Sequence, residues 1–162
     1  AFDIRKDDGL SAAGITYTGL DELFAESDII SLHCPLTPET RHLFSAASLG
    51  RMKRGAMLIN TSRGAVLDTG EVIRALKTGH LGYLGIDVYE QESALFFRDL
   101  SEGIIQGDMI ARLMSFPNVL ITSHQGFFTR EALEQIAKTT LGNLTAFELE
   151  IAGPTRVPLP VR

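Results

Sequence analysis

Three polar side chains of different chemistry follow apolar runs of this 162-residue chain. Arg63, Glu92 and His124 each stand a few residues beyond a run that is typical of a buried strand. In an open parallel sheet, ligands bind outside the carboxyl ends of the strands, so we expect these side chains to share one edge. A guanidinium holds a carboxylate through two parallel hydrogen bonds, and an imidazole exchanges a proton near neutral pH. The pattern therefore predicts carboxylate binding and proton transfer.

Each of these residues also has an ordinary structural interpretation. Arg63 could be a surface arginine whose stem covers apolar atoms, and His124 could be a hydrogen-bonded surface histidine. A carboxylate that bonds one ring nitrogen would fix the tautomer of His124 for proton transfer. Glu92 and Glu90 both follow the same apolar run, and their spacing does not choose between them.

The remaining reactive side chains give weaker signals. The four histidines and the single cysteine show no zinc-ligand spacing, so we predict no metal site. Cys34 is interpreted as a packing residue or, beside Pro35 at a strand end, as part of a cofactor site. Ser62 lacks the Gly-x-Ser-x-Gly context of a nucleophilic serine. We interpret His42 and His80 as solvated loop residues.

Asp3 is a candidate for nucleotide binding. An acidic residue at the end of the second strand of a dinucleotide-binding fold binds ribose hydroxyls, and it favours NAD over NADP. The Gly-x-Gly-x-x-Gly pattern that holds the pyrophosphate in that fold does not occur in this sequence.

The elements around these residues alternate between strand and helix patterns, which predicts an α/β fold with a parallel sheet. The expected strands are Ile15–Thr18, Asp28–His33, Ala56–Asn60, Gly82–Val88 and Val119–Thr122. The expected helices are Leu20–Glu26, Ser45–Met52, Asp68–Thr78, Asp108–Met114 and the amphipathic Thr129–Glu150. Asp68 is suited to cap its helix and Gly79 to end it in a left-handed conformation.

Composition narrows the classes of partner. The chain is 44% hydrophobic and 22% charged, as in ordinary globular domains, and its formal net charge is −5. The acidic balance argues against nucleic acid and against an anionic membrane. No apolar run is long enough to span a bilayer, and a single cysteine fits a reducing compartment, so we expect a cytoplasmic protein.

Several motifs occur together in one order along the chain. They are Ser31–Thr40 (SLHCPLTPET), Leu58–Gly64 (LINTSRG), Gly85–Glu90 (GIDVYE) and Ser123–Gln125 (SHQ). From Asp3 to about Glu150 the sequence resembles the D-isomer-specific 2-hydroxyacid dehydrogenases. The Tyr-Glu-x-Glu ending, Leu95–Phe97 and Ile104–Gln106 resemble the fermentative D-lactate dehydrogenase branch of that family.

The resemblance implies a role for each candidate. Arg63 would bind the substrate carboxylate and keto oxygen, His124 would be the acid/base, and Glu92 rather than Glu90 would be its partner. Phe127 would contact the substrate methyl group. NAD would be bound by Asp3, Cys34, Pro35, Thr40, Thr61, Ser62, Arg63 and Asp87. Thr40 stands where the family pattern leads us to expect asparagine, which weakens that single assignment.

The resemblance also implies an architecture. The fold would be part of a doubly wound, Rossmann-type parallel sheet that lacks its first strand and Gly-rich turn. Residues 1–150 would form a partial NAD-binding domain and residues 151–162 an extended tail. We expect this chain to be a C-terminal piece of a longer enzyme and to be inactive by itself. The longer enzyme would interconvert pyruvate and D-lactate and form a homo-oligomer such as a dimer. The alternative is an NAD-sensing or corepressor-like module without catalysis.

Overall fold

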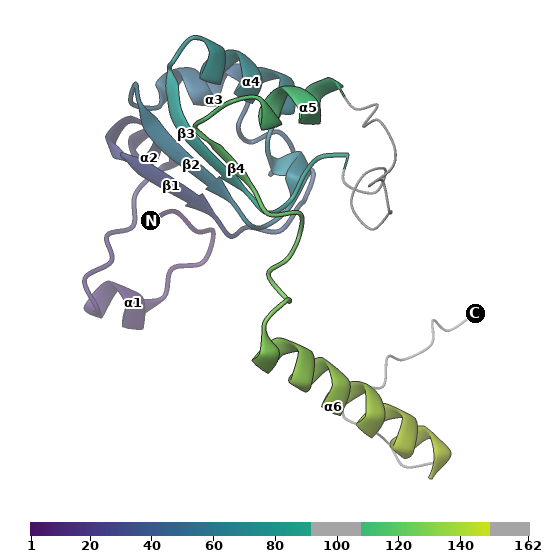
Figure 1. Cartoon of the computed structure of the whole chain (residues 1–162). Coiled ribbons are helices and arrows are strands. Elements are labelled where there is room, and N and C mark those ends of the chain that lie inside the picture. Colours follow the sequence, from purple (N-terminus) through teal and green to yellow (C-terminus); the bar gives the residue numbers. More distant parts are fainter. Residues whose placement is uncertain (92–107, 150–162) are drawn as a thin grey trace. The chain divides into compact units, whose positions relative to one another are not determined.

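The protein contains a four-stranded, fully parallel sheet (Figure 1). The computed structural model describes residues 1–91 and 108–149. The strands are β1 (Ile29–Leu32), β2 (Ala56–Asn60), β3 (Leu81–Ile86) and β4 (Val119–Ile121), and they lie side by side in chain order. Four of the five predicted strands are thereby confirmed, within a few residues at their ends.

Six α-helices and one short 3-10 helix occur among the described residues. They are α1 (Asp8–Ala12), α2 (Leu20–Glu26), α3 (Ala46–Arg51), the 3-10 helix η1 (Gly64–Val66), α4 (Thr69–Lys77), α5 (Asp108–Met114) and α6 (Arg130–Glu148). All five predicted helices are confirmed, whereas α1 and η1 were not predicted. The chain divides into two compact units, Ala1–His124 and Gln125–Arg162.

Helix α4 shows why the local sequence folds as it does. The Asp68 carboxylate accepts a hydrogen bond from the Glu71 amide at 3.1 Å, which satisfies one free donor of the first turn. Val72 and Leu76, one turn apart, are both buried. Gly79 follows the helix with φ +63°, a conformation that glycine adopts without steric cost.

The two faces of the sheet differ in burial. Leu58, Leu84 and Ile86 are almost fully buried on one face, where they join the core under the helices. On the other face Tyr83 is 54% exposed and Leu120 is 66% exposed. Successive parallel strands that advance in one direction place their right-handed crossover helices on the same side. The observed unit is therefore one half of a doubly wound arrangement.

The predicted strand Ile15–Thr18 is wrong. In the described part of the chain, the sheet ends at β1, and no ladder reaches residues 1–18. The Thr18 amide donates to the Ala1 carbonyl at 2.8 Å, and the Ala1 amino group donates to the Thr16 carbonyl at 2.5 Å. These two bonds pair the segments locally without a neighbouring strand to extend the ladder.

The second unit contains helix α6. The Thr129 hydroxyl caps it by accepting from the Ala132 amide at 3.2 Å. Its apolar side chains are largely exposed within the unit, including Leu141 and Phe147. The predicted domain boundary at residue 150 and the extended tail over 151–162 fall at or beyond the end of the described residues and stay predictions.

Candidate active site at the carboxyl edge of the sheet

Backbone hydrogen bonds tie together the loops that follow β2, β3 and β4. The Asp87 amide donates to the Asn60 carbonyl at 3.0 Å, and the His124 amide donates to the Asp87 carbonyl at 2.5 Å. The Asp87 carboxylate also accepts from the Thr122 hydroxyl at 2.5 Å. The loops that carry Asp87 and His124 therefore lie at the same edge as the loop that carries Arg63.

Asn60 shapes the loop that carries Arg63. Its side chain is fully buried and bridges the turn: the amide nitrogen donates to the Arg63 carbonyl at 2.9 Å. Its oxygen accepts from the Ser62 amide at 3.0 Å and from the Ser62 hydroxyl at 2.9 Å. The Arg63 side chain is exposed, and Nη1 donates to the Ser62 carbonyl at 2.7 Å. A guanidinium held at an exposed edge is suited to contact a ligand.

Gly64 brings this loop against the segment that follows β3. A Cβ atom built on Gly64 would lie 2.1 Å from the Tyr89 carbonyl carbon and 2.3 Å from the Glu90 nitrogen. Real side-chain atoms do not approach backbone so closely, so only glycine fits. The turn after Arg63 is thereby packed directly on the Tyr89–Glu90 peptide.

The backbone at His124 is in an unfavourable conformation. Ser123 has φ +55° and His124 has φ +57°, in the left-handed region that residues with a Cβ rarely adopt. Each such residue costs about 1–3 kcal/mol, and such conformations cluster at functional sites. The His124 side chain is half-buried at the edge that also carries Asp87.

A hollow of about 480 Å³ lies at the carboxyl ends of β1 and β2. It is lined by His33, Cys34, Pro35, Leu36, Thr61, Ser62 and Arg63. Five of the eight residues predicted to bind NAD therefore line one cavity. Thr40 is not among the lining residues, but its hydroxyl donates to the Pro35 carbonyl at 2.7 Å and so shapes the loop beside the hollow.

The structure does not test the predicted roles of three further site residues, each for a different reason. Asp3 lies outside any strand, and its carboxylate accepts a hydrogen bond from the Arg5 amide at 2.8 Å. Phe127 belongs to the second unit, where it stacks edge-to-face on Phe128. Glu92 lies outside the described residues.

His42 and Glu90 form a cluster that the sequence analysis missed. His42 Nε2 lies 2.7 Å from Glu90 Oε1, and the Thr69 hydroxyl donates to Glu90 Oε2 at 3.1 Å. Both carboxylate oxygens of Glu90 are thus engaged with residues other than His124. The interpretation of His42 as a solvated loop residue is wrong, because it pairs with a residue 48 positions away. No short-range pattern signals such a pair.

His80, which was also interpreted as a solvated loop residue, makes a hydrogen bond within the fold. Its Nε2 lies 2.9 Å from the Leu49 carbonyl, at the end of the sheet where β3 begins. His80 therefore connects two elements of the fold and takes no part in the carboxyl edge.

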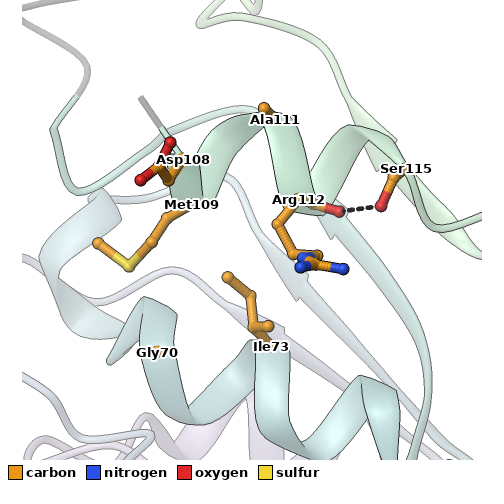
Figure 2. A pocket seen from close by; sticks show the side chains of 7 residues that line it. All are labelled: Gly70, Ile73, Asp108, Met109, Ala111, Arg112 and Ser115. Carbon is orange, nitrogen blue, oxygen red and sulfur yellow. Dashed lines mark hydrogen bonds between the residues drawn. The ribbon is translucent and has the colours of Figure 1, made fainter. Parts of the chain in front are cut away.

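A second hollow, of about 650 Å³, lies between α4 and α5. The side chains of Ile73, Met109 and Arg112 extend into the space between the two helices (Figure 2). None of the predicted site residues lines it. The cavity with the predicted chemistry is the one at the carboxyl edge.

Comparison with known proteins decides the family. Residues 1–126 match the model of the D-isomer specific 2-hydroxyacid dehydrogenase NAD binding domain. The chain belongs to the D-isomer-specific 2-hydroxyacid dehydrogenase family. The family resemblance inferred from the sequence motifs is thereby confirmed, together with the Rossmann-type α/β fold and NAD as the cofactor.

Individual members of the family are closely similar. A 2-hydroxyacid dehydrogenase A of Aspergillus oryzae is 56% identical over 83% of this chain and 39% of its own length. A D-lactate dehydrogenase of Escherichia coli is 51% identical over 91% of the chain and 45% of its own length. The chain therefore spans less than half the length of these curated relatives.

Solved structures agree with these sequence matches. A D-lactate dehydrogenase of Aquifex aeolicus, complexed with NAD and lactic acid, has a TM-score of 0.81 and 39% identity. It covers 92% of this chain, and the chain covers 45% of it. A pyruvate reductase of Chlamydomonas reinhardtii has a TM-score of 0.88 and 43% identity over 93% of this chain.

The residues at the carboxyl edge fit part of an NAD molecule. The hollow combines an apolar wall from Cys34 and Pro35 with hydroxyl groups from Thr61 and Ser62 and the nearby Arg63 guanidinium. That mixture suits a flat ring beside a ribose, a combination that occurs at both ends of the cofactor. The glycine pattern for the pyrophosphate does not occur in this sequence. In the described ranges, no helix could span a membrane, and no cluster of three or more His, Cys, Asp or Glu side chains could hold a metal.

Proposed function

We propose that the full-length protein carrying this chain is a D-2-hydroxyacid dehydrogenase that interconverts pyruvate and D-lactate. The observation that carries the proposal is the hydrogen-bonded edge at which the Asn60, Asp87 and His124 backbones meet. The same edge of the sheet carries the histidine loop and the arginine loop, and the arginine loop also lines the hollow of about 480 Å³. The names of the relatives, D-lactate dehydrogenase among them, agree with this substrate class.

The residues divide the reaction between binding and proton transfer. NADH supplies the hydride that reaches the keto carbon of the substrate. Arg63 holds the substrate carboxylate by paired hydrogen bonds and so orients the keto group, which a lysine could do only as a point charge. His124 in its protonated form donates a proton to the keto oxygen, which becomes the hydroxyl of the product. In the reverse direction the neutral imidazole accepts that proton.

Glu92 and Phe127 complete the proposal. Glu92 would bond the His124 ring and favour its protonated form. Glu90 is the weaker candidate for that role, because His42 and Thr69 already engage its two oxygens. Phe127 would contact the methyl group of the substrate, and Asp3 would bind the ribose of the adenosine end. We further propose a cytoplasmic homo-oligomer that associates through the nucleotide-binding domain.

The alternative function is an NAD-sensing module without catalysis. Such a module needs neither a guanidinium nor a histidine with a strained backbone at one edge of the sheet, so Arg63 and His124 favour the enzyme. If the position of His124 needed only a hydrogen-bonding side chain, a residue that adopts this backbone conformation at lower cost would serve.

The decisive experiment replaces His124 in the full-length protein. Asparagine is the appropriate substitution, because it tolerates a left-handed backbone and cannot donate a proton as an acid. We expect His124→Asn to lower kcat for pyruvate reduction about 10²- to 10⁴-fold while NADH binds as tightly as before. The matched control is His80→Asn, which removes a half-buried histidine contact at the opposite edge and should leave kcat unchanged.

Two outcomes would overturn the assignment. Unchanged turnover in His124→Asn would remove the acid/base role. A parent protein that binds NADH but reduces none of pyruvate, hydroxypyruvate and glyoxylate would instead support the sensing module. If only the last two are reduced, the enzyme class stands and the pyruvate assignment is wrong.

A further inference from the structure

His42 lies where three loops of the carboxyl edge meet. Its backbone amide donates to the Ala65 carbonyl at 2.9 Å, in the turn that follows Arg63. Two residues on, the Phe44 amide donates to the Val66 carbonyl at 3.2 Å. The loop after β1 is therefore paired along its backbone with the turn that follows β2.

The His42 ring extends this connection to the segment after β3. Its Nε2 bonds Glu90 at 2.7 Å, and the second Glu90 oxygen accepts from the Thr69 hydroxyl at 3.1 Å. The Glu90 backbone is the surface on which Gly64 packs. By holding Glu90, the His42 ring therefore also holds the backbone against which Gly64, the residue after Arg63, is packed.

Other charged groups face the same pair. Asp68 Oδ2 lies 4.0 Å from His42 Nδ1, and Arg41 Nη2 lies 3.8 Å from Glu90 Oε1. Glu90 is the most enclosed of these groups, with its side chain 18% exposed, whereas the Arg41 side chain is 57% exposed. The short contact between His42 and Glu90 is therefore the dominant interaction of the cluster.

The backbone of His42 is itself strained. It has φ +50° and is, with Ser123 and His124, one of three non-glycine residues with positive φ within the described ranges. A residue keeps such a conformation when the surrounding contacts require it, and asparagine or glycine would adopt it at lower cost. The imidazole contact to Glu90 is the feature that neither of those residues could supply.

We propose that His42 is a positioning residue that sets the place of Arg63 through Glu90 and Gly64. This inference rests on the proposed function, since it takes Arg63 as the group that binds the substrate carboxylate. His42 does not line the hollow. It acts by holding the Glu90 segment against the turn on which the guanidinium is mounted.

The first test is a steady-state comparison in the full-length protein. His42→Asn keeps a residue that tolerates the left-handed backbone but is too short to reach Glu90. We expect KM for pyruvate to rise about tenfold, with kcat much less affected, because misplaced binding groups weaken substrate orientation. Glu90→Gln should shift KM in the same direction, and the control His80→Asn should leave it unchanged.

A double-variant cycle separates positioning from general destabilisation. In an Arg63→Lys background, the bidentate contact is already lost, so His42→Asn should add little further loss in kcat/KM. Full additivity of the two losses would overturn the proposal, and so would an unchanged KM in His42→Asn alone.

An activity-independent readout keeps the test separate from the proposed function. Hydrogen exchange of the peptide that covers residues 63–67 should quicken in His42→Asn and not in His80→Asn. If the parent reduces no 2-oxo acid, the proposed function fails while the exchange result still decides whether His42 holds this turn. Unchanged exchange together with unchanged KM would leave His42 without a positioning role.

Discussion

Closely packed glycines and side-chain amides join loops to the sheet at both its amino edge and its carboxyl edge, but the two edges differ in backbone strain. At the amino edge, Gly82 packs against the Gly55 carbonyl, as Gly64 packs against the Tyr89–Glu90 peptide at the carboxyl edge. Asn118 there donates to the Gly82 carbonyl at 2.6 Å, as Asn60 donates to the Arg63 carbonyl. Close packing and buried amides are thus general means of joining loops to this sheet.

The difference lies in where the backbone is strained. At the amino edge the left-handed positions are glycines, Gly55 with φ +85° and Gly79 with φ +63°. At the carboxyl edge His42, Ser123 and His124 occupy such positions despite the steric cost. Glycine would relieve the strain at His42 and His124 as it does at Gly55 and Gly79, so the imidazole side chains are the reason to keep histidine there. We therefore propose that the residues of the amino edge serve stability, whereas those of the carboxyl edge serve chemistry.

The largest expected contrast concerns two arginines, one at each edge. Arg63→Lys in the full-length protein should lower kcat/KM for pyruvate about 10²- to 10³-fold, because an ammonium cannot reproduce the paired hydrogen bonds to a carboxylate. Arg54, at the amino edge, donates to the Thr78 carbonyl at 3.0 Å. Arg54→Lys should leave kcat/KM unchanged.

Steady-state kinetics with NADH and pyruvate would check this pair. Equal losses in both variants would show that the contrast between the edges does not extend to function. A loss confined to Arg54→Lys would reverse it.

The second contrast concerns the two glycines that pack against backbone. Gly64→Ala and Gly82→Ala should each lower the free energy of unfolding by about 1–3 kcal/mol, because a Cβ atom would overlap main-chain atoms in both cases. Only Gly64→Ala should also raise KM for pyruvate, since it displaces the turn beside Arg63. Urea unfolding and kinetics on the same preparations would measure both effects.

Matched stability losses with matched KM values would contradict this assignment. Turnover should be measured at a temperature well below both unfolding transitions, so that the fraction of folded protein does not enter the comparison.

How far the sequence predicts this molecule depends on the range of the interaction. Apolar periodicity predicted five strands and five helices, and four of the strands and all of the helices are confirmed, because burial repeats with the period of each element. The capping role of Asp68 followed from residues three positions apart. Ile15–Thr18 failed as a strand because a ladder needs a neighbour that no local pattern supplies.

The site was predicted less completely than the fold. The family motifs identified most of the residues around the hollow, including Cys34 and Arg63. The His42–Glu90 pair escaped because it joins loops from different strands and requires a left-handed histidine. Such pairs depend on the assembled sheet, so no spacing rule finds them.

The smallest expected contrast concerns two tyrosines. Tyr89 is buried at the carboxyl edge, and its burial, aided by the negative charge of Glu90, raises the pKa of its phenol above the usual value of about 10. Tyr83 is 54% exposed on the open face of the sheet.

A raised pKa means that the folded state holds the phenol proton more tightly than the unfolded state. The stability that this contributes is complete below about pH 10 and is lost as the pH rises through the folded-state pKa. Tyr89→Phe should therefore flatten the decline of the free energy of unfolding, measured by urea unfolding, between about pH 9 and about pH 11. The free energy of unfolding of Tyr83→Phe should decline with pH as steeply as that of the parent protein. If both variants decline alike, the phenol at the carboxyl edge titrates as it would in water, and the contrast between the edges does not reach Tyr89.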